Sequence, residues 1–247
     1  MSNITVFETK NTKVTCYNSQ HPRLIISLDN HRKDRTGFPP ANPSSFFAAN
    51  NMAFITIYVA NNDWFLNDDL PQLRAALSQF TQRFEHITSI GYSMGGYGAL
   101  LLSRESRAKQ IVLVSPQSSI FANRAPFETR YLSEASQLNP DLDTMAKHPR
   151  KGLRGVLLFD PTHKIDSQHK DVICNLHPKI QPVPLPFGGH PAMAVIGQAK
   201  LYSGVQKELL RKRFRVSEIL RLHKQARRRA PIYQEGLNRY LTKRNLR

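Results

Sequence analysis

The sequence predicts an α/β protein with a mostly parallel β-sheet flanked by helices, followed by a basic helical extension. Two observations support this class. Short apolar segments rich in β-branched residues alternate with segments whose apolar residues recur at helical spacing. In addition, 247 residues suffice for one large α/β domain with a substantial core. We expect this domain to span residues 1–200 and the extension to span residues 201–247.

The N-terminal part contains four predicted strands. Residues 4–7 and 14–17 are β-rich runs separated by polar turn residues, which predicts an antiparallel hairpin at a sheet edge. Residues 23–29 and 53–60 are nearly continuous apolar runs, as expected of strands that are covered on both faces. The polar residues 30–51 between them form a long loop, and such loops above a sheet often carry function.

A Gly-x-Ser-x-Gly motif is the most informative local signal. It reads GYSMG at residues 91–95, after the predicted strand 86–91 and before the helix-forming residues 99–104. On such a strand–turn–helix bend the serine hydroxyl projects above the carboxyl end of the strand, and the flanking glycines avoid clashes of Cβ atoms. Ligands of parallel sheets bind beyond the carboxyl ends of the strands. The motif therefore predicts a nucleophile elbow with Ser93 as the nucleophile.

Three further strands follow the motif, at residues 110–115, 156–159 and 180–186. Residues 117–151 contain several prolines and short helical patterns, which predicts a small helical excursion, or lid, able to cover part of the site. A helix that Asp166 caps lies between the last two strands. Strands and helices thus alternate on both sides of the serine motif.

The predicted nucleophile needs a base to accept its proton and a carboxylate to orient that base. In elbow architectures the acid and the histidine follow the serine in this order, in loops after strands. His190 follows the last strand through a two-glycine turn and is the predicted base. Asp160 directly follows the strand 156–159 and is the favoured acid. Asp166 is the alternative acid, although helix capping already explains an aspartate at a helix start.

The order of strand, GYSMG elbow, acid after a strand and glycine-histidine pair after the last strand resembles the α/β-hydrolase superfamily. The resemblance covers residues 23–190 and implies a serine hydrolase fold without a cofactor. It also implies an oxyanion hole of two backbone amides, one from Met94 and the other from Asn30 or His31. The loop that holds Asn30 and His31 departs from the common type because it has no glycine near its start.

These residues predict an esterase-type serine hydrolase that cleaves a carboxylic ester or thioester through an acyl-enzyme on Ser93. The expected substrate is a small-molecule or glycan-linked acyl ester. The alternative is a catalytically weak or inactive hydrolase-fold protein that serves as a binding or accessory module, for example in surface-glycan or secretion pathways. The unusual loop at Asn30 and His31 favours this alternative.

Neither a metal nor a cofactor is predicted. His163 and His169 have no further ligands at metal-binding spacing, and Cys16 and Cys174 lie far apart in the sequence. The two cysteines are therefore expected to be free thiols in a reducing compartment.

The C-terminal part of the chain is strongly basic. Residues 200–247 contain 15 Lys and Arg but 3 Glu, so the first 199 residues hold only +5 of the net charge of +17. Such a segment can contact an acidic protein, an anionic membrane or nucleic acid, or it can form a solvated helical surface. Residues 1–8 lack the features of a signal peptide, and no apolar run approaches the roughly 20 residues of a transmembrane helix. We expect a cytoplasmic protein without a transmembrane segment.

Overall fold

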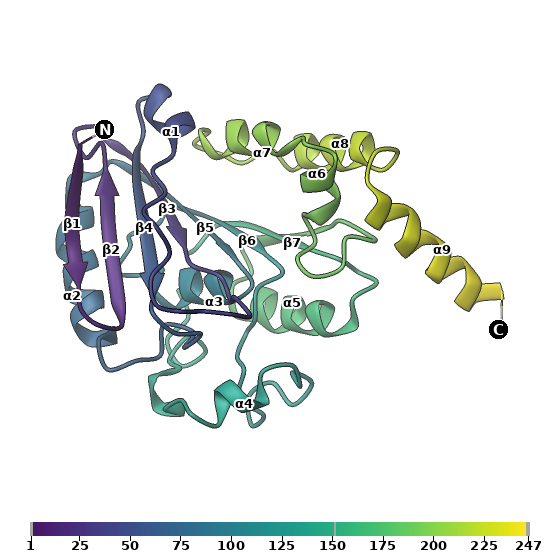
Figure 1. Cartoon of the computed structure of the whole chain (residues 1–247), viewed down its shortest axis with the longest axis horizontal. Helices are drawn as coiled ribbons and strands as arrows, with labels where there is room; N and C mark the ends of the chain where they lie inside the picture. The colour runs from purple at the N-terminus through teal and green to yellow at the C-terminus, as the bar shows by residue number, and fades with distance from the viewer. Residues whose placement is uncertain (1, 151, 246–247) are drawn as a thin grey trace.

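The computed structural model describes residues 2–150 and 152–245, and its centre is an eight-stranded sheet (Figure 1). The strand order is β1-β2-β4-β3-β5-β6-β7-β8. The strands are β1 (Asn3–Glu8), β2 (Thr12–Tyr17), β3 (Arg23–Leu28), β4 (Ala53–Val59), β5 (His86–Tyr92), β6 (Gln110–Val114), β7 (Gly155–Phe159) and β8 (Ile180–Pro184). β1 and β2 form an antiparallel hairpin at one edge, β2 is antiparallel to β4, and the pairs from β4 to β8 are parallel. The predicted mostly parallel sheet and its edge hairpin are therefore confirmed.

Helices cover both faces of the sheet (Figure 1). The α-helices among the described residues are α1 (Ser45–Ala49), α2 (Leu70–Phe80), α3 (Met94–Leu101), α4 (Leu132–Ala135), α5 (Lys164–Leu176), α6 (Ala194–Gln198), α7 (Tyr202–Leu209), α8 (Val216–Ala226) and α9 (Pro231–Asn245). α2, α3 and α5 share one buried cluster with Leu24 of β3, whereas α1, α6, α7 and α8 share another with Ile25. Successive residues of a strand point to opposite faces. Both faces of the sheet are therefore buried, which explains the continuous apolar runs.

The segment 117–150 contains α4 and a short 3-10 helix (Pro140–Leu142). It is fixed to the sheet layers by a buried carboxylate, because Asp143 accepts hydrogen bonds from Tyr97 of α3 and from Ser119, both at 2.7 Å. The Arg124 guanidinium also lies 2.8 Å from Asp143. The predicted excursion is thus anchored through its own polar groups. Its predicted last residue, Lys151, lies outside the described residues.

The basic C-terminal segment contributes to the core to different degrees along its length. Side chains of α7 and α8 belong to the same buried cluster as the central strands. α9 instead packs on α6 through Tyr233 and extends away from the sheet (Figure 1). The division of the chain at residue 200 stays a prediction, and residues 1, 246 and 247 lie outside the described part. No helix among the described residues has the length and apolar character needed to cross a membrane.

Candidate active site

Ser93 lies on a strained turn between β5 and α3. Its φ of 49° and ψ of −120° fall in a region that non-glycine residues rarely occupy. A Cβ at Gly91 would lie 2.0 Å from the carbonyl oxygen of Gly95, and a Cβ at Gly95 would lie 2.7 Å from the carbonyl oxygens of Leu28 and Asp29. Both motif glycines are thus required by close backbone approach, as expected for an elbow. The helix after the turn starts earlier than the sequence predicts.

Three polar side chains form a continuous hydrogen-bonded chain at this turn. Ser93 Oγ lies 2.8 Å from His190 Nε2, and His190 Nδ1 lies 2.8 Å from Asp166 Oδ2. With the imidazole proton on Nδ1, the ring donates to the carboxylate and accepts the serine proton at Nε2. The structure therefore brings together the predicted nucleophile, the predicted base and the alternative acid.

Asp160, the favoured acid of the sequence analysis, makes different contacts. Its Oδ2 accepts a hydrogen bond from the Gly189 amide at 2.7 Å, and its Oδ1 accepts from the amide and hydroxyl of Thr162 at 2.8 and 2.7 Å. Both carboxylate oxygens are thus engaged by the loops on either side of the site. Asp160 holds the backbone just before His190, whereas Asp166 contacts the imidazole itself.

The start of α5 explains why Asp166 is available for this contact. The sequence pattern places Asp166 at the N-cap, but the helix begins at Lys164, and His163 caps it by accepting the Asp166 amide at 3.3 Å on Nδ1. The Asp166 carboxylate is therefore not used for capping. Burial opposes its ionisation, yet the interactions with the His163 and His190 imidazoles outweigh burial and hold the pKa of Asp166 well below its usual range.

A buried network joins Asp166 to the segment 117–150. Arg130 donates to Asp166 Oδ1 at 3.1 Å and to Glu128 Oε2 at 2.6 Å. His169 Nδ1 accepts the Ser118 amide at 3.0 Å, so its Nε2 donates to Glu128 Oε2 at 2.8 Å. Burial would raise the pKa of Glu128, but the hydrogen bonds from His169 and Arg130 prevail and lower it to about 2. Two ionised carboxylates thus hold Arg130 between them.

Two side chains that the sequence analysis did not single out lie beside Ser93. The buried Gln117 places its Nε2 3.1 Å from Ser93 Oγ. Burial raises the pKa of the Tyr131 phenol, and the neighbouring Ser93 hydroxyl partly offsets that rise. Gln117 follows β6 at the carboxyl edge of the sheet, so the rule that pointed to Asp160 and His190 also points to it. Nothing local in the sequence indicates Tyr131.

The backbone amides predicted for the oxyanion hole differ in their hydrogen bonding. Met94 is the first residue of α3, where helix geometry leaves the amide without an intrahelical partner. The Asn30 amide already donates to Asp29 Oδ1 at 3.0 Å. The His31 ring lies 5.3 Å from the ring of Tyr131, the neighbour of Ser93, measured between centroids. Of the two alternatives for the second donor, the structure thus shows the Asn30 amide occupied by a carboxylate.

Two ion pairs fix the loop that carries Asn30 and His31. Arg32 and Arg35 each place a guanidinium nitrogen 2.7 Å from the Asp29 carboxylate, which is buried. Arg35 also donates to Asn62 at 2.8 Å. These contacts set the path of a loop that lacks the glycine common at this place.

The part of the chain that the structure describes contains no group of three His, Cys, Asp or Glu side chains able to hold a metal ion. Cys16 is a buried free thiol, and Cys174 is a half-buried one. Burial raises the pKa of Cys16 to about 12, so its thiol stays protonated at neutral pH.

Solved structures of known proteins resemble this chain. The capsule O-acetyltransferase of Neisseria meningitidis serogroup A is 15% identical, with a TM-score of 0.57 over 83% of this chain and 93% of its own. A variant of that protein was solved in complex with CoA. The Pyrococcus furiosus esterase Pf2001 is 12% identical, with a TM-score of 0.51 over 87% of this chain and 93% of its own. A proposed thioesterase from Silicibacter sp. TM1040 is 13% identical, with a TM-score of 0.53 over 78% of each chain.

These likenesses establish the architecture. The chain has the α/β-hydrolase fold, as the sequence resemblance implies. No protein-family model matches the chain, and a comparison with curated proteins gives no match.

Proposed function

We propose that the protein is a serine hydrolase that cleaves a carboxylic ester or thioester through an acyl-enzyme on Ser93. The observation that carries this proposal is the chain of two 2.8 Å contacts from Ser93 through His190 to Asp166. The backbone strain at Ser93 adds support, since strained conformations of this kind cluster at functional sites.

The proposed reaction uses these groups in two steps. His190 Nε2 takes the Ser93 proton while Oγ attacks the acyl carbon, and the protonated imidazole then gives that proton to the leaving alcohol or thiol. In the second step, His190 deprotonates a water that attacks the acyl carbon, which releases the acid and restores the Ser93 hydroxyl. Asp166 stabilises the imidazolium that forms in both steps, and its low pKa keeps it ionised.

The oxyanion that forms on the acyl oxygen needs hydrogen-bond donors. We assign one donor to the amide of Met94. For the second donor we now favour the His31 amide over that of Asn30, because Asn30 already donates to Asp29. The Gln117 amide group at 3.1 Å from Ser93 Oγ orients the nucleophile by donating to its lone pair.

A fluorophosphonate probe tests the proposal directly. We expect the probe to label Ser93 of the folded protein, and Ser93→Ala to abolish labelling and to lower turnover of short p-nitrophenyl esters by about 10⁴-fold or more. Ser118→Ala is a matched control, because Ser118 Oγ also lies 2.9 Å from a histidine nitrogen, Nδ1 of the buried His169. That control should retain labelling. Silence of the probe in a folded wild-type sample would support the accessory-module alternative.

Acyl transfer is a second candidate function, and a specific cavity favours it. A cavity of 280 Å³ lies between α9 and the loops that carry Asp160 and Gly189, and Arg239 and Lys243 line it. Cations beside the site suit the phosphates of a CoA thioester, the ligand of the capsule O-acetyltransferase variant. If transfer is the reaction, Arg239→Glu/Lys243→Glu should raise the KM for acetyl-CoA about tenfold without changing turnover of p-nitrophenyl acetate.

A further inference from the structure

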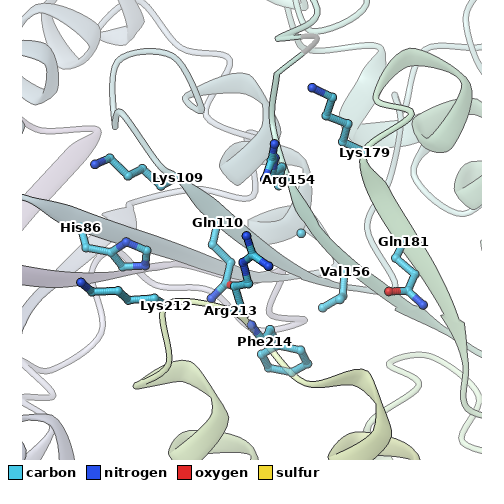
Figure 2. Close-up of a pocket in the computed structure, with 11 residues that line it drawn as sticks. His86, Lys109, Gln110, Arg154, Val156, Lys179, Gln181, Lys212, Arg213 and Phe214 are labelled. Carbon is cyan, nitrogen blue, oxygen red and sulfur yellow. Dashed lines mark hydrogen bonds between the residues drawn. The ribbon is translucent and has the colours of Figure 1, made fainter.

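Figure 2 shows the residues that line a second cavity. It lies where strands β5, β6 and β7 begin, whereas Ser93 follows the end of β5. Its volume is 490 Å³, and it is bordered by the first residues of β5, β6 and β7 and by the loop between α7 and α8. β5 runs from His86 at this cavity to Tyr92 beside Ser93. Seven strand residues span roughly 20 Å, so the cavity is separate from the candidate active site.

The charged side chains around this cavity are all basic. The cations are Lys109, Arg154, Lys179, Lys212 and Arg213, and no carboxylate lines the cavity. Among residues 2–150 and 152–245, none of the five forms an ion pair. By contrast, Arg211 and Arg215 in the same loop region both pair with Glu208. Five cations that form no ion pair among the described residues are thus grouped around one cavity.

The loop between α7 and α8, which carries Lys212 and Arg213, is hydrogen-bonded to residues of the sheet. Gln110, the first residue of β6, accepts the Phe214 amide at 2.7 Å and donates to the Arg211 carbonyl at 3.3 Å. Arg23 donates to the Leu210 carbonyl from the neighbouring part of the sheet. Hydrogen bonds to the sheet thus hold the loop backbone on both sides of Lys212 and Arg213.

His86 lies close enough to two of the five cations to feel their charge. Its Nε2 is buried without a hydrogen-bond partner. Burial lowers the pKa of His86, and the charges of Arg23, Lys109 and Lys212 lower it further. Two of these cations, Lys109 and Lys212, line the cavity together with His86.

We propose that this cavity binds a compact, multiply phosphorylated small molecule. Five cations match the charge of two or three phosphate groups, and Arg and Lys are the side chains that proteins use for phosphate. The volume falls within the range of small-molecule sites, roughly 300–1,000 Å³. The cations come from four separate segments that surround the cavity, so they can contact a compact ligand from several sides. The proposal does not depend on the reaction at Ser93.

Isothermal titration calorimetry with sodium tripolyphosphate, ATP and AMP tests the site in the full-length protein. We expect tripolyphosphate and ATP to bind with one-to-one stoichiometry and more tightly than AMP. Lys212→Glu/Arg213→Glu should weaken tripolyphosphate binding by at least about tenfold. The matched control Arg228→Glu/Arg229→Glu makes the same change in net charge at exposed residues between α8 and α9, and it should bind within about twofold of the wild type.

A second double variant tests the site without changing the loop between α7 and α8, so that misfolding of this loop cannot explain the result. Lys109→Gln/Lys179→Gln changes two exposed cations outside that loop and should also weaken tripolyphosphate binding by about tenfold. The proposal is overturned if tripolyphosphate does not bind at low salt, or if both Glu double variants weaken binding equally. It is also overturned if a single-stranded oligonucleotide binds more tightly than tripolyphosphate, because the basic surface would then serve a polymer.

Discussion

At the scale of single residues, Asp160 and Asp166 are two buried aspartates whose carboxylates make different contacts. Asp166 contacts the imidazole of His190, and Asp160 binds the Gly189 amide that precedes it. Sequence spacing favours the aspartate at the strand end, but spacing does not show where the helix after it begins. Once His163 takes the capping position, the carboxylate one turn inside the helix is released for the histidine.

Substitution of each aspartate by asparagine distinguishes a role in catalysis from a role in holding the loop before His190. Asp166→Asn should lower kcat for p-nitrophenyl acetate by roughly 10³- to 10⁴-fold, because the amide cannot hold the imidazole in the required tautomer. Asp160→Asn should lower kcat less than about tenfold and lower Tm by about 3–6 °C, because it loses a hydrogen bond to a buried loop. Steady-state kinetics and thermal unfolding monitored by circular dichroism measure both effects. Equal kinetic losses in the two variants would contradict this assignment.

At the scale of elements, the elbow depends on backbone contact between α3 and β3. A Cβ at Gly95 would lie 2.7 Å from the Leu28 and Asp29 carbonyl oxygens, which cannot move without shifting the strand. We expect Gly95→Ala to lower kcat at least about 100-fold and to cost about 2 kcal/mol of stability.

The control for the elbow is Gly197→Ala in α6, where an added Cβ meets no atom within 4 Å. This change should leave kcat unaltered and stabilise the protein by about 0.5–1 kcal/mol, because alanine is the better helix former. Urea unfolding of both variants checks the comparison. A Gly95→Ala protein with normal kcat would show that the turn tolerates a wider backbone separation.

The segment 117–150 is held to α5 by an ionised carboxylate, which makes its anchoring sensitive to acid. The pKa of Glu128 falls from 4.5 to about 2 in the folded protein. The unfolded chain therefore binds a proton more readily, so the stabilisation is complete above pH 4.5 and is lost as the pH falls toward 2. The shift corresponds to about 3 kcal/mol at neutral pH.

Replacement of Glu128 tests this pH dependence. Glu128→Gln should lower the free energy of unfolding at pH 7 and should make it change less than the wild-type value between pH 5 and pH 3. Glu235→Gln, at an exposed position of α9, should leave the wild-type pH profile intact. Urea midpoints measured across this pH range provide the comparison, and parallel profiles for wild type and Glu128→Gln would refute the anchoring role.

At the scale of the whole molecule, the basic C-terminal segment divides into a part that belongs to the core and a part that does not. Val205, Leu209, Ile219 and Leu222 are each at most 6% exposed and pack with the central strands. Their burial contributes about 6–12 kcal/mol, similar to the net stability of a typical domain. α9 buries mainly Tyr233 against the rest of the chain.

Truncations measure this difference. A chain that ends at residue 200 should fail to fold, whereas a chain that ends at residue 229 should remain folded with a moderately lower Tm. Circular dichroism and limited proteolysis distinguish the outcomes. Stable folding of the shorter chain would show that residues 201–226 are dispensable for the core.

The sequence by itself determined the local features of this protein. Continuous apolar runs specify strands buried on both faces, and the GYSMG turn specifies a strained serine because only glycines permit the backbone contacts beside it. The position of His190 after the last strand also follows from the sequence, since parallel strands end at one edge of the sheet.

Only the tertiary structure decided which other groups meet there. Asp166 rather than Asp160 contacts His190, and Gln117 and Tyr131 lie beside Ser93 although their segment has no recognisable motif. The structure likewise gathers five cations from separate segments at the opposite edge. These contacts depend on where each helix begins and on how loops that are distant in sequence approach one another. The packing of the whole chain sets both, whereas the neighbours in sequence do not.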